Sequence, residues 1–334
     1  MFPSIARRSG QELSASAGNV TGMIHTRALT KDFVVNRRTT VHAVRGISLD
    51  IGPGELVAVL GPNGAGKTTT LRMLTTLIAP TSGTATVAGH DVATEAARVR
   101  RQIGYVGQGN GAGHIHRVHD ELRTQGRIYG LDRAAATRRT DELLEALDLA
   151  ELRDRKVSDL SGGQRRRLDV AIGLVHAPRL LFLDEPSTGL DPQNRANLWQ
   201  HILRMREEHR MTIVLTTHYL DEADTMAERV VVVDHGEVIA DDTAAALKAK
   251  LAGDKLILTG DDLTLLAKAA AQLPGARDLT ETSGVLSLRV NDGPAALPEL
   301  IAAVPGGVRT AEIQRPTLDD VFLSLTGRNL REHS

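Results

Sequence analysis

Residues 56–69 read LVAVLGPNGAGKTT, and this stretch decides the type of fold. Its first part, Leu56 to Leu60, is apolar without alternation, which is typical of a strand buried on both faces. The next part, Gly61 to Thr68, has two glycines separated by four residues and followed by Lys-Thr, the phosphate-loop pattern. The stretch therefore predicts a buried strand, a phosphate-binding loop and a helix start, with a glycine-rich turn as the alternative.

The residue types of this loop suit the binding of a nucleotide. The glycines let backbone N–H groups turn towards phosphate oxygens, and the helix that follows adds the positive end of its dipole. Lys67 can reach the outer phosphates, and Thr68 can ligate magnesium. The predicted nucleotide-binding residues of the loop are Gly61, Pro62, Asn63, Gly64, Ala65, Gly66, Lys67, Thr68 and Thr69. The loop predicts ATP or GTP binding and leaves kinase, GTPase and transport ATPase open.

A second apolar strand ends in two adjacent carboxylates. Residues 180–186 read LLFLDEP, so Asp184 and Glu185 stand at a strand end, where the sites of α/β proteins lie. There Asp184 is placed to hold magnesium, and Glu185 to orient and polarise an attacking water as a general base. Acidic residues also close strands for structural reasons. Next to a phosphate loop, however, the pair indicates hydrolysis of the nucleotide.

Residues 160–168 read LSGGQRRRL, a second glycine-bearing helix start with a hydroxyl group poised to meet an anion. Here the chain resembles the ATP-binding cassette (ABC) family, whose signature is the pentapeptide LSGGQ. The resemblance covers Met23 to about Ile239. The pieces that occur in the family's order are the phosphate loop, Gln108, the signature, Asp184-Glu185, residues 187–191 (STGLD) and His218.

The resemblance implies that two cassettes stack head to tail, with the signature of one chain facing the γ-phosphate held by the other. Because this chain carries one phosphate loop and one signature, a complete site then needs a second copy in an isologous dimer. The implied catalytic residues are Glu185, His218 and Lys67, and the implied magnesium ligands are Thr68, Gln108 and Asp184. The residues implied to act in trans are Ser161, Gly162, Gly163, Gln164 and Asp191. For His218, which would contact the γ-phosphate, a structural role is the alternative.

Other features of the cassette have two interpretations each. Phe33 is expected to stack on adenine, with core packing as the alternative. Residues 109–119 (GNGAGHIHRVH) are interpreted as a flexible solvated loop, and a metal site of His114, His116 and His119 is the alternative. Arg165 to Arg167 are interpreted as a solvated or interdomain helix face rather than a nucleic-acid patch.

Strand and helix patterns alternate along the chain and predict an α/β core with a mostly parallel sheet. Residues 1–22 are expected to form a flexible tail, and 240–334 a small α+β accessory domain. Between them, residues 23–239 are expected to form the ATP-binding domain, with an inserted helical subdomain at about 109–178. The resemblance implies the P-loop NTPase fold of ABC nucleotide-binding domains, with a RecA-like core and an antiparallel β subdomain. Strands are expected at 24–30, 41–49, 56–60, 84–88, 180–183, 212–215, 230–233, 255–258 and 285–290, and helices at 68–77, 134–149 and 195–208.

Composition excludes several classes of protein. There are no cysteines, which excludes disulfides and thiolate zinc sites. The 40 Lys and Arg nearly cancel the 41 Asp and Glu, so no global field attracts nucleic acid, and none is expected as a partner. Arg7 and Arg8 precede no apolar segment, and no stretch is long and apolar enough to span a bilayer. A cytoplasmic location is therefore expected.

Residues 313–327 (IQRPTLDDVFLSLTG) resemble the closing motif of the daunorubicin-resistance type of ABC ATPases. The pattern itself predicts a helix with Leu318, Val321, Phe322 and Leu325 on one side, packed in the core of the small domain. The resemblance implies the ATP-hydrolysing subunit of a drug exporter, peripheral at the cytoplasmic face of the membrane. Its partner would be a separate permease, which is expected to contact the exposed loop 109–122. The alternatives are a soluble ABC ATPase of translation or repair, and the ATPase subunit of an importer.

Overall fold

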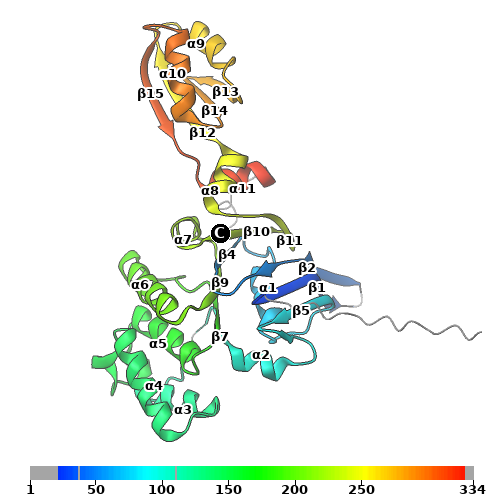
Figure 1. Cartoon of the computed structure of the whole chain (residues 1–334), viewed down its shortest axis with the longest axis vertical. Coiled ribbons are helices and arrows are strands. Elements are labelled where there is room, and N and C mark those ends of the chain that lie inside the picture. Colours follow the sequence, from blue (N-terminus) through cyan, green and yellow to red (C-terminus); the bar gives the residue numbers. More distant parts are fainter. Residues whose placement is uncertain (1–21, 37, 110, 328–334) are drawn as a thin grey trace, which may run out of the picture.

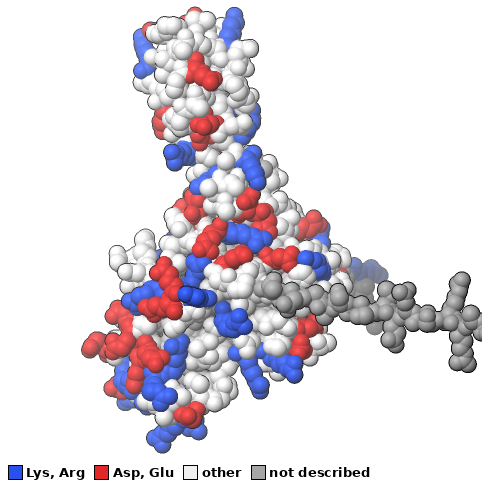
Figure 2. Space-filling view, in the orientation of Figure 1, with Lys and Arg blue, Asp and Glu red and all other residues white. Residues whose placement is uncertain are grey.

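The computed structural model describes residues 22–36, 38–109 and 111–327. The tail predicted for residues 1–22 lies outside these ranges except for Gly22, and so do residues 328–334 of the predicted accessory domain. Figure 1 shows a broad body and a small unit that stands at one end of it. Figure 2 shows basic and acidic side chains intermingled over the face of the body in view, without one continuous basic area.

A six-stranded sheet forms the centre of the body, in the order β11-β10-β4-β9-β8-β7. Its strands are β4 (Leu56–Leu60), β7 (Ile103–Val106), β8 (Leu180–Asp184), β9 (Thr212–Thr217), β10 (Arg229–Asp234) and β11 (Glu237–Asp242). All neighbours are parallel except β11, which pairs antiparallel with β10. Ala58 of β4 packs into one buried cluster and Val59 into another, so both faces of the strand are covered. The mostly parallel α/β core predicted from the sequence is confirmed.

A second, antiparallel sheet covers one side of this core, in the order β2-β1-β5-β6, with β3 paired to β1. Its strands are β1 (Ile24–Asn36), β2 (Thr39–Ile47), β3 (Asp50–Ile51), β5 (Ser82–Val87) and β6 (His90–Asp91). β1 is longer than the predicted 24–30 because, past Thr30, it continues as an exposed hairpin with β2 through several register shifts. Figure 1 shows this sheet and α1 on one side of the central sheet, and α5 and α6 on the other.

Helices of the body connect these strands. They are α1 (Lys67–Leu74), α2 (Ala96–Gln102), α3 (Val118–Ile128), α4 (Arg133–Ala146), α5 (Gly162–Leu174), α6 (Pro192–His209) and α7 (Leu220–Met226). Helices α3, α4 and α5 and two short 3₁₀ turns (Ala150–Leu152 and Val157–Asp159) occupy the predicted insertion, whose described residues form no strand. The exposed loop predicted for 109–122 is shorter than expected, because α3 begins at Val118 and buries Glu121.

The small unit has the order strand, helix, strand, strand, helix, strand. Its elements are β12 (Asp254–Gly260), α9 (Leu263–Ala270), β13 (Arg277–Thr282), β14 (Val285–Val290), α10 (Gly293–Ala303) and β15 (Val308–Gln314). The strands form one antiparallel sheet in the order β13-β14-β12-β15, which is the ferredoxin-like arrangement. Leu256 and Leu288 of the sheet pack with Leu266 and Leu300 of the helices in a core of their own.

The last helix, α11 (Leu318–Thr326), does not join that core. Leu318, Val321 and Phe322 are buried in the large cluster of the body, next to α7 and α8 (Ala244–Leu247) and the π-helical turn Lys248–Ala252. The predicted helix and its apolar side are therefore present, but its predicted packing in the small domain is wrong. An apolar stripe specifies that a helix face is buried, and not which core receives it.

Candidate active site

The loop between β4 and α1 is shaped by its glycines and by contacts with β2. Gly66, which precedes α1, has φ of 101°, in the left-handed region that favours glycine. A Cβ atom there would lie 2.5 Å from the carbonyl oxygen of Ala43, so β2 leaves no room for one. The loop can thus pass close to β2 and lead directly into the N-terminus of α1, where helix N–H groups can bind an anion.

Lys67 holds its ammonium group inside the loop. Its Nζ donates to the carbonyl oxygens of Gly61 at 2.6 Å and Pro62 at 3.0 Å. Burial lowers the pKa of Lys67, and the charges of Glu185 and Asp184 partly offset that shift. The amine is therefore ready to exchange backbone carbonyls for phosphate oxygens.

Thr68, Gln108 and Asp184 meet beside this loop. The Thr68 hydroxyl donates to Oδ1 of Asp184 at 2.9 Å, and Nε2 of Gln108 lies 3.2 Å from the same hydroxyl. Asp184 is fully buried, and the Thr216 hydroxyl donates to it at 2.7 Å. A hydroxyl, an amide and a carboxylate are the kinds of donor that magnesium prefers, so these residues fit the metal that the sequence predicts.

Glu185 stands directly after β8 in an uncommon backbone conformation, with φ of 49°. Its N–H donates to the carbonyl oxygen of Thr216, 3.1 Å away, which helps to hold this turn. Its Oε2 accepts from the Thr188 hydroxyl at 3.3 Å and lies 3.5 Å from Nδ1 of His218. The structure thus brings the predicted base and the predicted histidine next to each other.

A cavity of about 340 Å³ is lined by Gln108, Glu185 and seven of the nine predicted loop residues, all except Gly61 and Pro62. Its lining residues are Val41, His42, Ala43, Asn63, Gly64, Ala65, Gly66, Lys67, Thr68, Thr69, Gln108 and Glu185. The first three come from β2, and no motif in the sequence indicated them. Phe33 is the β1 partner of Val41 but is not part of the lining; its 40% exposure argues against core packing.

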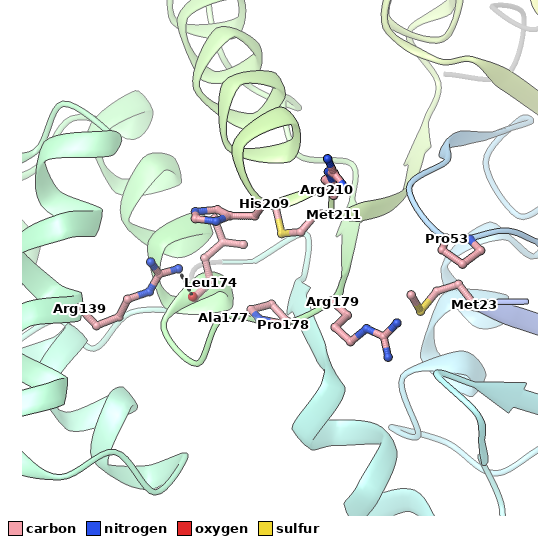
Figure 3. Close-up of a pocket in the computed structure, with 10 residues that line it drawn as sticks. All are labelled: Met23, Pro53, Arg139, Leu174, Ala177, Pro178, Arg179, His209, Arg210 and Met211. Atoms are coloured by element: carbon pink, nitrogen blue, oxygen red, sulfur yellow. Dashed lines mark hydrogen bonds between the residues drawn. The ribbon is translucent and has the colours of Figure 1, made fainter. Parts of the chain in front are cut away.

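A second cavity, of about 390 Å³, holds none of the predicted site residues. Figure 3 shows its charged side chains pointing to different sides, with Arg179 towards Met23 and Pro53, and Arg139 bound to the carbonyl oxygen of Leu174. Polar groups that specify a ligand usually converge on it. We therefore assign the site to the cavity at the phosphate loop.

The predicted signature residues lie together, away from the lining of that cavity. Ser161 caps α5, since its hydroxyl accepts from N–H of Gln164 while the Gln164 amide oxygen accepts from N–H of Ser161. A Cβ atom on Gly163 would lie 2.4 Å from Oδ1 of Asn194, whose Nδ2 donates to Asp191 at 2.5 Å. The signature and Asp191 thus form one surface beside the first turn of α6.

Of the two interpretations of Arg165 to Arg167, the solvated face is wrong. All three are buried on α5, and each guanidinium reaches a backbone carbonyl. Arg166 donates to the carbonyl oxygens of Pro186 at 2.6 Å and of Gly107 at 2.7 Å. This arginine therefore ties the signature helix to the segment after Glu185 and to the residue before Gln108.

The segment after Gln108 is also held by α5, through a residue that the sequence analysis did not single out. Oδ1 of Asp169 accepts from N–H of Gly111 at 2.9 Å and of Ala112 at 3.1 Å. Burial raises the pKa of Asp169, and these hydrogen bonds partly offset the shift. Asp169 lies on the same helix as the signature, and sequence alone does not show whether its side chain is buried or exposed.

The histidines of the same segment do not meet in a metal site. His114 lies beside Arg165, 3.3 Å from its guanidinium, while Nε2 of His119 lies 3.0 Å from Asp120. Among the described residues, no group of three or more His, Asp or Glu side chains is arranged to hold a metal ion. Ile115, between the histidines, is 86% exposed.

Comparison with known proteins places these residues in a family context. A family model described as ABC transporter matches residues 44–188, and one described as the C-terminal domain of DrrA1-3-like ATP-binding proteins matches residues 243–326. The daunorubicin resistance ATP-binding protein DrrA3 of Streptomyces coeruleorubidus is 42% identical over 308 residues, 91% of this chain and 97% of the relative. The daunorubicin/doxorubicin resistance ATP-binding protein DrrA of Streptomyces peucetius is 41% identical over 316 residues, 92% of this chain and 95% of the relative. A solved dimeric ATP-binding cassette, bound to ADP and Pi after hydrolysis, superposes with a TM-score of 0.61 at 25% identity and covers 66% of this chain and 98% of its own.

Proposed function

The chain belongs to the ATP-binding proteins of the ABC transporter family, and we propose from this premise how its residues drive an exporter. It is the ATP-binding and ATP-hydrolysing subunit of an ABC exporter, on the P-loop fold that its sequence predicts. The observation that carries the assignment of residues is one cavity that brings Lys67, Thr68, Gln108 and Glu185 together.

In this proposal the chain's own groups hold ATP and move one proton. Lys67 and the N–H groups of the loop bind the outer phosphates. Magnesium, held by Thr68, Gln108 and Asp184, would neutralise part of the phosphate charge. Glu185 takes a proton from a water molecule while the oxygen of that water attacks the γ-phosphorus. The bond between the γ-phosphorus and the bridging oxygen breaks, and ADP leaves with its electron pair. His218, next to Glu185, orients the base and contacts the γ-phosphate.

A second copy of the chain would complete each site. The signature residues Ser161 to Gln164 do not contribute to the lining of the cavity, and they form one surface with Asp191. In a head-to-tail pair, that surface of one copy faces the γ-phosphate bound by the other. The dimeric state of the solved cassette supports this arrangement.

We infer a membrane permease as the partner, and a hydrophobic, drug-like molecule as the cargo. The support is the identity to daunorubicin resistance proteins over most of the chain. Within the described residues, no helix has the length and apolarity needed to cross a bilayer. We propose that the chain docks on the permease from the cytoplasmic face, and that Ile115, exposed and apolar in the segment after Gln108, offers a contact.

The test of the catalytic assignment is Glu185→Gln in the full chain. The amide keeps the shape of the side chain and removes the charge that activates water, so hydrolysis should fall about a hundredfold or more, roughly 3 kcal/mol. ATP binding should persist, and dimers with trapped ATP should accumulate. Hydrolysis at the wild-type rate would refute the role of Glu185.

The docking of the permease is tested with Ile115→Glu, which adds a charge at an exposed position. Co-purification with a co-expressed membrane permease, and drug resistance in cells, should both decrease, while ATP binding by the isolated chain stays unchanged. Leu279→Glu, at an exposed site of the small unit, is the matched control. Unchanged resistance and co-purification would exclude this contact.

A further inference from the structure

Glu222, on α7, keeps its carboxylate inside the body and accepts three hydrogen bonds there. The residue is only 3% exposed. Its Oε1 accepts from the Ser187 hydroxyl and from the indole N–H of Trp199 at 3.0 Å, and its Oε2 accepts from the Thr217 hydroxyl at 2.9 Å. Hydrogen bonds to a buried charge are strong and directional. Three such donors fix the position of this carboxylate and, equally, fix the donors around it.

Two of the donors are close neighbours in sequence of the residues that act on ATP. Ser187 stands two residues after Glu185, and Thr217 directly precedes His218. The two segments leave the ends of adjacent strands, β8 and β9, where the last backbone bond between them runs from N–H of Glu185 to the carbonyl oxygen of Thr216. Beyond that bond, Glu222 links the two segments through hydrogen bonds from both Ser187 and Thr217.

We propose that Glu222 is a positioning residue for ATP hydrolysis, which sets the spacing of Glu185 and His218 by holding Ser187 and Thr217 together. The proposal rests on the function proposed above. Glu222 does not line the nucleotide cavity, so it acts through its two neighbours and not on ATP. Because a displaced base or orienting group costs rate without costing affinity, its loss should lower kcat and leave ATP binding intact.

A second contact joins the same segments. The guanidinium of Arg195, on α6, lies 3.9 Å from the ring centroid of Tyr219, which directly follows His218. Its Nε is 3.9 Å from Oε1 of Glu222, so it also balances the buried charge. Arg195 and Trp199 both belong to α6, so this helix contacts the Glu222 carboxylate through two side chains.

Two substitutions separate positioning from simple support of the core. Glu222→Gln keeps the oxygen that accepts from Ser187 and Trp199, but it turns an amide N–H₂ towards Thr217. The Thr217 hydroxyl already accepts from N–H of Tyr219 at 2.9 Å, so the third bond is weakened. Thr217→Val removes that bond, together with the bond that the hydroxyl accepts from N–H of Tyr219, and leaves the bonds from Ser187 and Trp199 to Glu222 in place. Both variants keep the volume of the core and should fold.

The experiment measures kcat and KM for phosphate release from ATP with magnesium, and Kd for ATP by calorimetry, on the full chain. Glu222→Ala should lower kcat at least about tenfold and keep Kd within about twofold. Glu222→Gln and Thr217→Val should give intermediate kcat values with unchanged Kd. Asp221→Ala, exposed on the same helix, is the matched control and should behave as wild type.

Trp199 supplies a readout that does not depend on turnover, because it is the single tryptophan of the chain. Its emission responds to the hydrogen-bond partner of its indole N–H, so Glu222→Ala should shift the emission maximum. Glu222→Gln, Thr217→Val and Asp221→Ala should keep the wild-type maximum, because each retains an oxygen beside Trp199.

Two results would overturn the proposal. One is a wild-type kcat in Glu222→Ala or, should that variant not fold, in both Glu222→Gln and Thr217→Val. The other is a fall in kcat that matches a fall in ATP affinity. Failure of the proposed function is recognised separately, since then wild type and Asp221→Ala would also release no phosphate.

Discussion

The Nδ1 atom of His218 lies 3.5 Å from Oε2 of Glu185, although 33 positions separate the two residues in the chain. We predict that His218→Ala lowers kcat for ATP hydrolysis about a hundredfold, because the carboxylate loses its orienting neighbour and the γ-phosphate a donor. Kd for ATP should change less than about threefold. Phosphate release and calorimetry measure the two values. His209→Ala, on an exposed residue at the end of α6, is the control. A kcat equal to that of the control would count against the role of His218.

Mixing two inactive variants tests whether a site is built from two chains. Ser161→Arg disrupts the signature, and Lys67→Ala disrupts the phosphate loop. In a head-to-tail heterodimer both lesions fall in one composite site and leave the other intact. The mixture should therefore hydrolyse ATP faster than either variant alone, with up to about half of the dimers being heterodimers at equal amounts. An ATP analogue that cross-links both motifs of a single chain would refute the arrangement.

Sequence alone was sufficient for the elements that depend on local pattern. Leu56 to Leu60 is apolar without alternation, and β4 is buried on both faces as such a run predicts. The glycines of the loop after β4 also have a local reason, because the left-handed backbone conformation at Gly66 favours glycine. Local rules of this kind also predicted a helix start at the signature, and α5 begins there with Ser161 as its cap.

Sequence was insufficient where a side chain's role depends on distant backbone. Three consecutive arginines are usually solvated, yet Arg165 to Arg167 are buried because carbonyl groups of loops far along the chain receive them. Glu222 has no motif of its own, and its three donors come from residues 5 to 35 positions away. Such contacts exist only once the sheet has brought the loops together.

The segment after Gln108 should depend on Asp169 for its order. Oδ1 of Asp169 accepts from two backbone N–H groups of the segment, and each hydrogen bond to a charged group contributes about 1.5–3 kcal/mol to stability. Asp169→Ala should therefore speed hydrogen exchange at the amides of Gly111 and Ala112 by at least about tenfold. Asp169→Asn keeps an accepting oxygen and should show a smaller change. Equal exchange rates in both variants and wild type would show that the segment is held by other contacts.

Stability should decrease in mild acid through His176, whose ring stacks on Tyr129 with centroids 3.8 Å apart. Burial lowers the pKa of His176 below its usual 6.5, although the bond from Nε2 to the carbonyl oxygen of Ile103 opposes the shift. The unfolded chain therefore takes up a proton at a higher pH than the folded chain does. The contribution of neutral His176 to the free energy of unfolding is therefore fully present above about pH 6.5, and it is lost as the pH falls below that value.

The measurement is the urea midpoint of unfolding at about pH 7.5 and about pH 5.5. His176→Gln can still donate to Ile103 but cannot titrate, so its midpoint should fall less between the two pH values than that of wild type. His116→Gln, at an exposed histidine, serves as the control and should keep the wild-type dependence. The same dependence in all three chains would assign the acid effect to other groups.

The last helix should contribute more to the stability of the body than to that of the small unit. Phe322 is 1% exposed within the large core, and Leu323, next to it, is 38% exposed. Removal of a buried Phe side chain costs about 3–5 kcal/mol, so Phe322→Ala should destabilise the body strongly and Leu323→Ala only slightly.

The polar end of α11 stays tied to the small unit, because Arg289 of β14 donates to Asp320 at 2.5 Å. Phe322→Ala should therefore detach the helix from α7 and expose the segment around Arg315 to protease, while the sheet of the small unit keeps its hydrogen-exchange protection. Equal unfolding midpoints for the two variants would mean that α11 does not pack on the body in solution.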